Sequence, residues 1–184
     1  DLYQLLDAVM LTGAEMSMGK GNSRLARISI TRRHDHWRLL YWYMVILQQH
    51  GIEMRIRGYR SAVRTGSITF SSLHQPLMVR AYRRWYRSVG KQLPLDLLIN
   101  KPTLCILLAG ALRRWSRGSQ KSNQIIIPTP PCHLMSLGSL TSQVREHVPV
   151  VSSCMLSRSG RIRVPADAAM AFVDGAVPQS IWRY

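Results

Sequence analysis

The segment LCILLAGALRRWSRGS (104–119) is an apolar run that ends in arginines and a glycine, and the architecture of the whole chain can be worked out from it. Its apolar residues have helical spacing, and the small residues at 109–111 would let this helix approach another helix closely. The far end of the same helix carries Arg113, Arg114 and Arg117. The stretch therefore predicts a buried helix that delivers positive charge to one surface.

A similar stretch, LYQLLDAVMLTG (2–13), opens the chain. Its leucines and valine also have helical spacing, and Ala8 is the small residue near its centre. Two such helices far apart in one chain indicate a duplicated architecture.

The composition favours a compact protein that binds a polyanion. A chain of 184 residues with 46% hydrophobic residues can bury a core, as one unit or as two closely packed halves. The net charge is +16, with only nine acidic residues, and such a field attracts nucleic acid first of all. Lysine is rare, so arginine supplies most of the positive charge, and arginine can both grip phosphate and stack on bases.

The cysteines predict neither a disulfide framework nor a zinc site. Cys105, Cys132 and Cys154 are odd in number and have no CxxC spacing, which indicates small buried side chains in a reducing compartment. The apolar runs are too short to cross a bilayer, so no membrane association is expected.

Alternating segments predict strands with one apolar and one basic face. The period of two occurs at 24–31, at 52–59 and at 161–164. The residues expected on the basic faces are Arg27, Arg55, Arg57, Arg161 and Arg163. Strands are also predicted at 63–71 and 123–127, and PTPPC (128–132) is interpreted as a turn.

Helices are predicted at 34–50, 75–89, 134–147 and 167–175. In the first of these, a stripe of large side chains is expected to face the core, and the aromatic residues among them are interpreted as core rather than as a platform for stacking bases. That stripe consists of Trp37, Leu40, Tyr41, Met44 and Leu47. Helices and strands in this order predict an α+β fold.

Other candidate sites are weaker. His34 and His36 could be imagined as a metal pair, but no third ligand has suitable spacing, and the segment is interpreted as a helix start at which Asp35 suits the helix dipole. The scattered serines have no His and acid partners that would indicate a hydrolase triad.

Four segments, in this order, resemble one known family. They are the first helix with TGAEM (12–16), SSLHQPLMVRAYRRWYRSVGKQLPLDLL (71–98), ILLAGALRRWSRG (106–118) and IRVPADAAMAFVDGAVPQSIWRY (162–184). They resemble the LAGLIDADG homing endonucleases and maturases, in the branch with two motifs in one chain. The first and third segments are similar to the first and second motifs of that family. The second segment is similar to its Ser-x-x-His-Pro, Trp-Tyr, Gly-Lys and Pro pattern, and the fourth is similar to its closing strand, helix and Pro-x-Ser tail.

The resemblance implies two pseudo-symmetric αββαββα halves whose saddle-shaped antiparallel sheets lie on nucleic acid. The halves are expected at 1–100 and 101–184. They would pack together as one monomeric unit about an internal pseudo-twofold axis, with the two motif helices against each other.

Departures from the family pattern predict that catalysis is lost. In the family, each motif helix ends in an acid, and the two acids hold divalent metal beside the scissile phosphates. Here the resemblance places Ala14 at the first position and Arg117, preceded by Ser116, at the second. Glu15 is expected one residue further along a helix, turned by about 100°. No catalytic residue, metal or other cofactor is therefore expected.

The sequence instead predicts an inactive, RNA-binding relative of these enzymes. The residues expected to contact phosphate are Arg27, Arg55, Arg57, Arg113, Arg117, Arg161 and Arg163. The favoured partner is the ribosomal RNA of a mitochondrial ribosome, together with other ribosomal proteins, because the charge covers both halves and the flank at 80–87 offers a second surface. A splicing maturase acting on intron RNA is the alternative, an active DNA endonuclease is less favoured, and the chloroplast is the alternative compartment.

Overall fold

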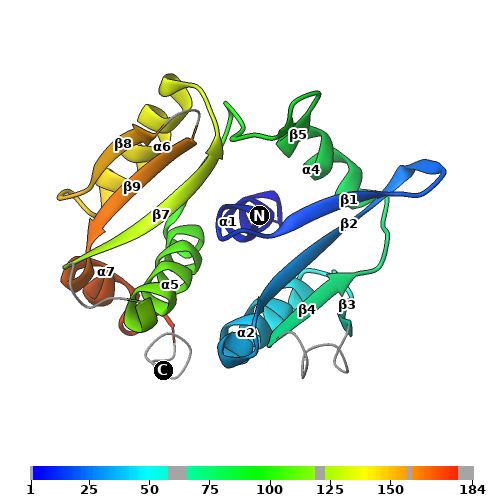
Figure 1. Cartoon of the computed structure of the whole chain (residues 1–184), viewed down its shortest axis with the longest axis horizontal. Coiled ribbons are helices and arrows are strands. Elements are labelled where there is room, and N and C mark those ends of the chain that lie inside the picture. Colours follow the sequence, from blue (N-terminus) through cyan, green and yellow to red (C-terminus); the bar gives the residue numbers. More distant parts are fainter. Residues whose placement is uncertain (1, 58–65, 119–122, 157–158, 178–184) are drawn as a thin grey trace. The chain divides into compact units, whose positions relative to one another are not determined.

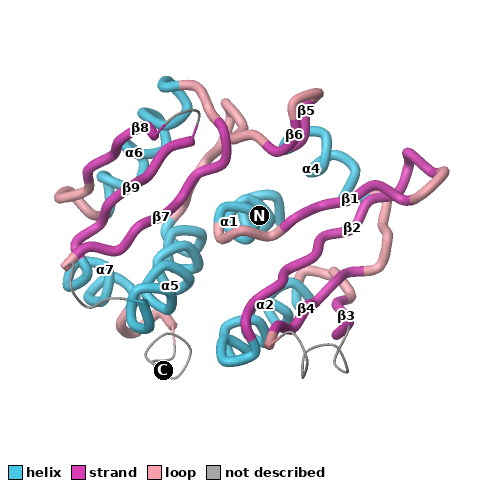
Figure 2. The backbone as a smooth tube through the Cα atoms, in the orientation of Figure 1, coloured by secondary structure: helices cyan, strands magenta, loops and turns pink. Residues whose placement is uncertain are grey.

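The computed structural model describes residues 2–57, 66–118, 123–156 and 159–177 (Figure 1). The elements up to residue 85 are α1 (Leu2–Leu11), β1 (Glu15–Gly19), β2 (Asn22–Arg33), η1 (His34–His36), α2 (Trp37–Gln49), β3 (Met54–Arg57), β4 (Ser67–Ser72) and α4 (Leu77–Trp85). Those that follow are β5 (Tyr86–Arg87), β6 (Gly90–Lys91), α5 (Lys101–Gly118), β7 (Gln124–Pro131), α6 (Leu134–His147), β8 (Ser152–Leu156), β9 (Ser159–Pro165) and α7 (Ala166–Val173). Helices and strands alternate along the chain (Figure 2), so the predicted α+β class is confirmed.

Two antiparallel sheets repeat one topology. The first has the strand order β1-β2-β4-β3, and the second has the order β7-β9-β8. Because β7, β9 and β8 correspond to β2, β4 and β3, the predicted duplication is visible in the connections. The first repeat reads αββαββα, and in the described part of the second repeat no strand corresponds to β1.

The chain divides into two compact units. One consists of residues 13–84 with Leu2 and holds the first sheet. The other consists of residues 3–12 and 85–184, with Asp1, and holds the second sheet. We call them the first-sheet unit and the second-sheet unit. Helix α1 thus groups with α5 and the second sheet, and the predicted boundary between residues 100 and 101 stays a prediction.

Helices α1 and α5 are buried almost all round, as expected for helices that are apolar on every side. Every residue of α1 from Leu5 to Leu11 is buried, and so is every residue at 103–112 of α5. Asn100 joins the two helices: its Oδ1 accepts the N–H of Thr103 at 3.0 Å, and its Nδ2 donates to Gln4 Oε1 at 2.6 Å. The side chain that caps α5 therefore also holds the first turn of α1.

The rest of α1 is held by the last residue of α4 and by a lysine that follows that helix. The indole Nε1 of the buried Trp85 donates to Oδ1 of the buried Asp7 at 2.6 Å. Lys91 Nζ donates to the carbonyl oxygen of Met10 at 2.8 Å and lies 5.6 Å from the centroid of the Trp85 ring. A lysine at this position satisfies a carbonyl that the end of the helix leaves open.

Helix α2 covers the apolar face of the first sheet with a stripe of residues different from the predicted one. Its buried residues are Leu39, Leu40, Tyr43 and Leu47. Trp37 and Tyr41, predicted to be core, are 48% and 52% exposed. The sequence WRLLYWYMVILQQ is apolar or aromatic on nearly every side, so its periodicity does not select one face.

Strand β7 corrects the turn predicted at PTPPC, because the strand continues to Pro131. It lies at the edge of the described second sheet, where proline costs no ladder hydrogen bond. The register shifts between Pro128 and Pro131, as at a bulge. An edge position thus accommodates the prolines that, from sequence, indicate a turn.

Two further differences concern the first sheet. Strand β1 follows α1 after only three residues, although its sequence, EMSMG, gives no clear strand signal. In β3, Ile52 and Met54 mark the buried side as predicted, but Ile56 is 54% exposed. Segments 58–65 and 178–184, the latter including the tail that resembles the family, lie outside the described residues.

Gly160 allows the close packing beneath the second sheet. A Cβ atom at this position would lie 2.7 Å from Leu137 Cδ1 and 2.9 Å from Thr129 Oγ1, and that hydroxyl already accepts the N–H of Gly160 and donates to its carbonyl. We expect Gly160→Ala to lower the free energy of unfolding by about 1–3 kcal/mol, the usual cost of overpacking a core, measured by urea denaturation.

Gly138→Ala is the matched control, because a Cβ at this exposed position in α6 meets nothing within 4 Å. It should raise stability by about 0.5–1 kcal/mol, since alanine is the better helix former. Equal effects of the two substitutions would contradict the packing described for Gly160.

Candidate nucleic-acid interface

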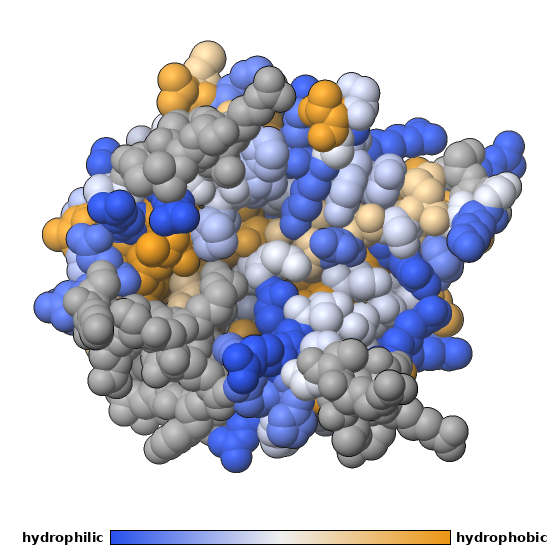
Figure 3. All heavy atoms as spheres, viewed as in Figure 1, coloured by the Kyte–Doolittle hydropathy of each residue, from blue (hydrophilic) through white to orange (hydrophobic). Residues whose placement is uncertain are grey.

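The first sheet has a polar face that follows directly from strand alternation. In β2, Ile28 and Ile30 are fully buried, so Arg27, Ser29 and Thr31 lie on the opposite face. The surface over β2 and β4 is mostly pale to blue in Figure 3, as a face of hydroxyl and charged residues should be.

Cross-strand register arranges this face in rows. One row runs Glu15, Ser29, Ser71, Arg55 across β1, β2, β4 and β3. The next row runs Thr31, Thr69, Arg57 across β2, β4 and β3. The rows end in arginines on β3 that are exposed, which places Arg55 and Arg57 as predicted on the polar face.

Side-chain hydrogen bonds hold the centre of the face. The hydroxyl oxygens of Ser29 and Ser71 are 3.0 Å apart, and those of Thr31 and Thr69 are 2.8 Å apart. Arg27 Nε donates to Ser17 Oγ on β1 at 3.1 Å. The centre is therefore a fixed layer of hydroxyl groups. Ser71 is buried, so Ser29, Thr31 and Thr69 are the members that can bond phosphate and sugar oxygens, with little base-specific geometry.

Arg55 lies beside an acidic side chain. Arg55 donates from Nη2 and Nε to Glu53 Oε1, at 2.7 and 3.0 Å, and both side chains are exposed. Such an exposed pair exchanges readily with solvent and ions, so the carboxylate weakens but does not block a contact between Arg55 and phosphate.

The second sheet presents a corresponding pair of arginines. Arg161 and Arg163 on β9 are exposed, and they alternate with the buried Ile162 and Val164. Arg163 lies opposite Ile126 on one neighbouring strand and Ser152 on the other. The structure thus places Arg27, Arg55 and Arg57 on one sheet, and Arg161 and Arg163 on the other, each set within its own unit.

Arg113 and Arg117 belong to the last turns of α5, as predicted. Their side chains lie outside the described part of the structure. The contact of all seven arginines with phosphate stays a prediction.

The positions that the family resemblance assigns to metal-binding acids have an unexpected local geometry. Helix α1 ends at Leu11, and Glu15 is the first residue of β1, so the helical rotation expected between Ala14 and Glu15 does not apply. Ala14 is fully buried, whereas Glu15 is exposed and lies opposite Ser29 on the polar face. Across the described ranges, no three His, Cys, Asp or Glu side chains gather as a metal site would require.

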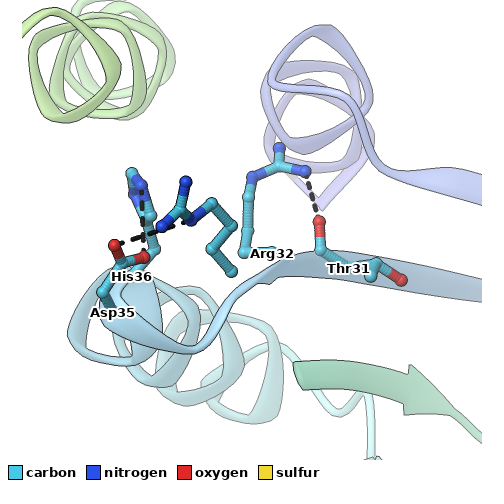
Figure 4. Close-up of polar contacts among 5 residues, drawn as sticks. Thr31, Arg32, Asp35 and His36 are labelled. Carbon is cyan, nitrogen blue, oxygen red and sulfur yellow. Dashed lines mark hydrogen bonds and ion pairs between the residues drawn. The ribbon is translucent and has the colours of Figure 1, made fainter. Parts of the chain in front are cut away.

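Arg32 is a residue of this region that sequence reasoning missed. It continues the buried side of β2 after Ile28 and Ile30, and its Nη1 donates to the carbonyl oxygen of Thr31 at 2.7 Å (Figure 4). Burial lowers the pKa of the Arg32 guanidinium from its ordinary value, and Tyr43 opposes that shift. A Cβ atom on Gly13 would lie 3.3 Å from Arg32 Nη2, so positive charge lies beside the residue that precedes Ala14.

Comparisons with known proteins bear on the fold alone. No protein-family profile matches the chain, and no curated protein matches it. A solved structure described as the homing endonuclease I-WcaI bound to its DNA recognition sequence superposes with a TM-score of 0.67, over 100% of this chain and 87% of that chain, at 9% sequence identity. The fold is therefore that of a homing endonuclease.

The described ranges contain no helix that combines the length and the apolar character needed to cross a membrane.

The contact between Gly13 and Arg32 can be tested by substitution. Gly13 has φ +98°, a conformation that costs an L-residue about 1–2 kcal/mol. Because Arg32 must also move, we expect Gly13→Ala to lower the free energy of unfolding by more than that amount, measured by urea denaturation.

Gly51→Ala supplies the reference, because Gly51 has φ +79° and a Cβ there meets nothing within 4 Å. It carries the cost of the backbone conformation without the contact. If the two variants lose equal stability, the guanidinium does not lie against Gly13 in solution.

Proposed function

We propose that this chain is a catalytically inactive RNA-binding protein built on the homing-endonuclease fold. Its polar sheet faces would contact the phosphates and sugars of RNA, and its favoured partner is ribosomal RNA in a mitochondrial ribosome. The observation that carries the proposal is the combination of arginines and hydroxyls on the first sheet with a buried methyl group, Ala14, at the position where the family has an acid.

Charge supports nucleic acid as the partner. A net charge of +16 attracts a polyanion over a distance, and the structural neighbour I-WcaI was solved bound to DNA. On the first sheet, arginine and paired hydroxyls supply contacts to the nucleic-acid backbone, which fix position rather than sequence. Contacts of this kind are sufficient for binding a folded RNA within one defined assembly, where the assembly determines the RNA partner.

The local chemistry supports loss of cleavage. A methyl group cannot ligate a metal ion, and the nearby Arg32 adds positive charge that opposes divalent cations. Glu15 is the neighbouring carboxylate that could replace the missing acid at position 14. Because Glu15 is exposed on the polar face, it is the residue to test.

The proposal predicts no Mg²⁺-dependent cleavage of DNA or RNA by the purified chain. A randomised duplex library and RNA bound by the protein would be incubated with Mg²⁺ or Mn²⁺, and new ends would be sequenced. Cleavage that disappears in Glu15→Gln would overturn the inactive assignment and favour the endonuclease.

The proposal also predicts that sheet arginines contribute to the salt dependence of RNA binding. A substitution that removes one arginine–phosphate interaction should reduce the slope of log K against log salt by about 1 and weaken binding regardless of sequence. We expect this of Arg57→Gln and of Arg163→Gln, measured by filter binding over a salt series.

Arg145→Gln is the control with the same change in net charge. Arg145 lies on α6, and its Nε donates to the carbonyl oxygen of Val151 at 2.8 Å. A slope reduced equally in all three variants would mean that net charge, rather than the sheet faces, determines binding.

Crosslinking followed by sequencing of the bound nucleic acid distinguishes the partners. Ribosomal RNA with stoichiometric co-sedimentation supports the ribosomal role. Intron RNA, with unspliced introns and normal ribosomes when the protein is absent, supports the maturase.

A further inference from the structure

Helix α2 exposes two aromatic rings on consecutive turns. Trp37 and Tyr41 are spaced i, i+4, so they lie on the same side of the helix, and about half of each residue is exposed. The Arg38 Cζ atom lies 5.8 Å from the centroid of the Trp37 ring. We call Trp37, Arg38 and Tyr41 the α2 aromatic patch.

The surroundings of the patch are basic. Helix α2 contains no acidic residue, and Arg33 and His34 precede it. The acid at this end of the helix is Asp35, and its Oδ2 lies 3.7 Å from Arg33 Nε (Figure 4). The other carboxylate oxygen of Asp35, Oδ1, lies 3.7 Å from His36 Nε2, and Arg38 places its positive charge over the Trp37 ring.

The patch and the polar face of the first sheet lie on opposite sides of the first-sheet unit. Leu39, Leu40 and Leu47 bury one side of α2, and α2 covers the apolar face of the sheet. Since the hydroxyl rows lie on the other face of the sheet, the patch is a site separate from them.

We propose that the α2 aromatic patch stacks unpaired bases of an RNA strand. Single-stranded bases are bound by exposed aromatic rings and arginine planes beside positive charge, and each stacked base contributes substantially to affinity. Tryptophan, tyrosine and arginine are also common on protein-binding surfaces. The net charge of +16 and the absence of any acidic residue from α2 favour a polyanion at this patch. The proposal rests on the RNA-binding part of the proposed function and adds a second, base-contacting site to it.

The second site implies a particular kind of RNA. An RNA that contacts both sides of the first-sheet unit must bend round it and present a loop or single strand at α2. Large folded RNAs offer both features in one molecule.

The test uses the full chain, a single-stranded RNA oligonucleotide without secondary structure, and a hairpin RNA of equal length. Affinity is measured by fluorescence anisotropy for the wild type, Trp37→Leu, Trp37→Phe and Tyr41→Leu. We expect Trp37→Leu to weaken single-strand binding about tenfold and Trp37→Phe to retain most of it, because phenylalanine keeps a ring for stacking. The thermal midpoints should match that of the wild type, because both side chains are about half exposed.

The outcomes separate the two proposals. If all three variants bind the single strand as the wild type does, base stacking at α2 is wrong, while hairpin binding that falls in Arg57→Gln leaves the proposed function standing. If Trp37→Leu instead loses a protein that co-purifies with the wild type and keeps its RNA affinity, the patch is a protein-docking surface. If the wild type binds neither RNA, the proposed function itself fails.

Discussion

A β-strand sends successive side chains to opposite faces of its sheet, and this alternation determines both the core and the polar surface of the protein. In β2 the core requires Ile28 and Ile30, and the polar face then receives the residues between them. In β9 the same constraint buries Ile162 and exposes Arg161 and Arg163. A register slip of one residue would therefore destroy the core and the basic face together.

Where the pattern is unambiguous, the sequence predicts the fold well. The alternation in β2 and β9 and the helical spacing in α1 and α5 all correspond to elements of the structure, and they lead to the α+β class. The predictions fail where a sequence satisfies two patterns equally. In α2 an apolar sequence on every side left the buried stripe undetermined, and tertiary packing selected the one containing Leu39 and Tyr43. In β7 the prolines signal a turn, and only the edge position explains a strand.

Strand alternation also made part of the candidate site predictable. Alternation assigned Arg27, Arg55, Arg57, Arg161 and Arg163 to polar faces, but it could not assign Arg32, which continues a buried stripe. The proximity of Arg32 to Gly13 depends on how the chain leaves α1, and no local pattern encodes that. Helix α1 ends at Leu11, before both positions, so Ala14 is buried while Glu15 in β1 is exposed. A continuous helix would not predict this contrast in burial.

The prolines of β7 have a consequence for how the protein behaves before it meets any partner. An edge strand normally exposes unpaired amide N–H groups, with which a strand of a second protein molecule can form hydrogen bonds. Pro128, Pro130 and Pro131 carry no such hydrogens, so the C-terminal end of this strand is a poor template for intermolecular β-structure. In a chain with a net charge of +16, this end of the second sheet is therefore protected against aggregation by its covalent chemistry as well as by charge repulsion.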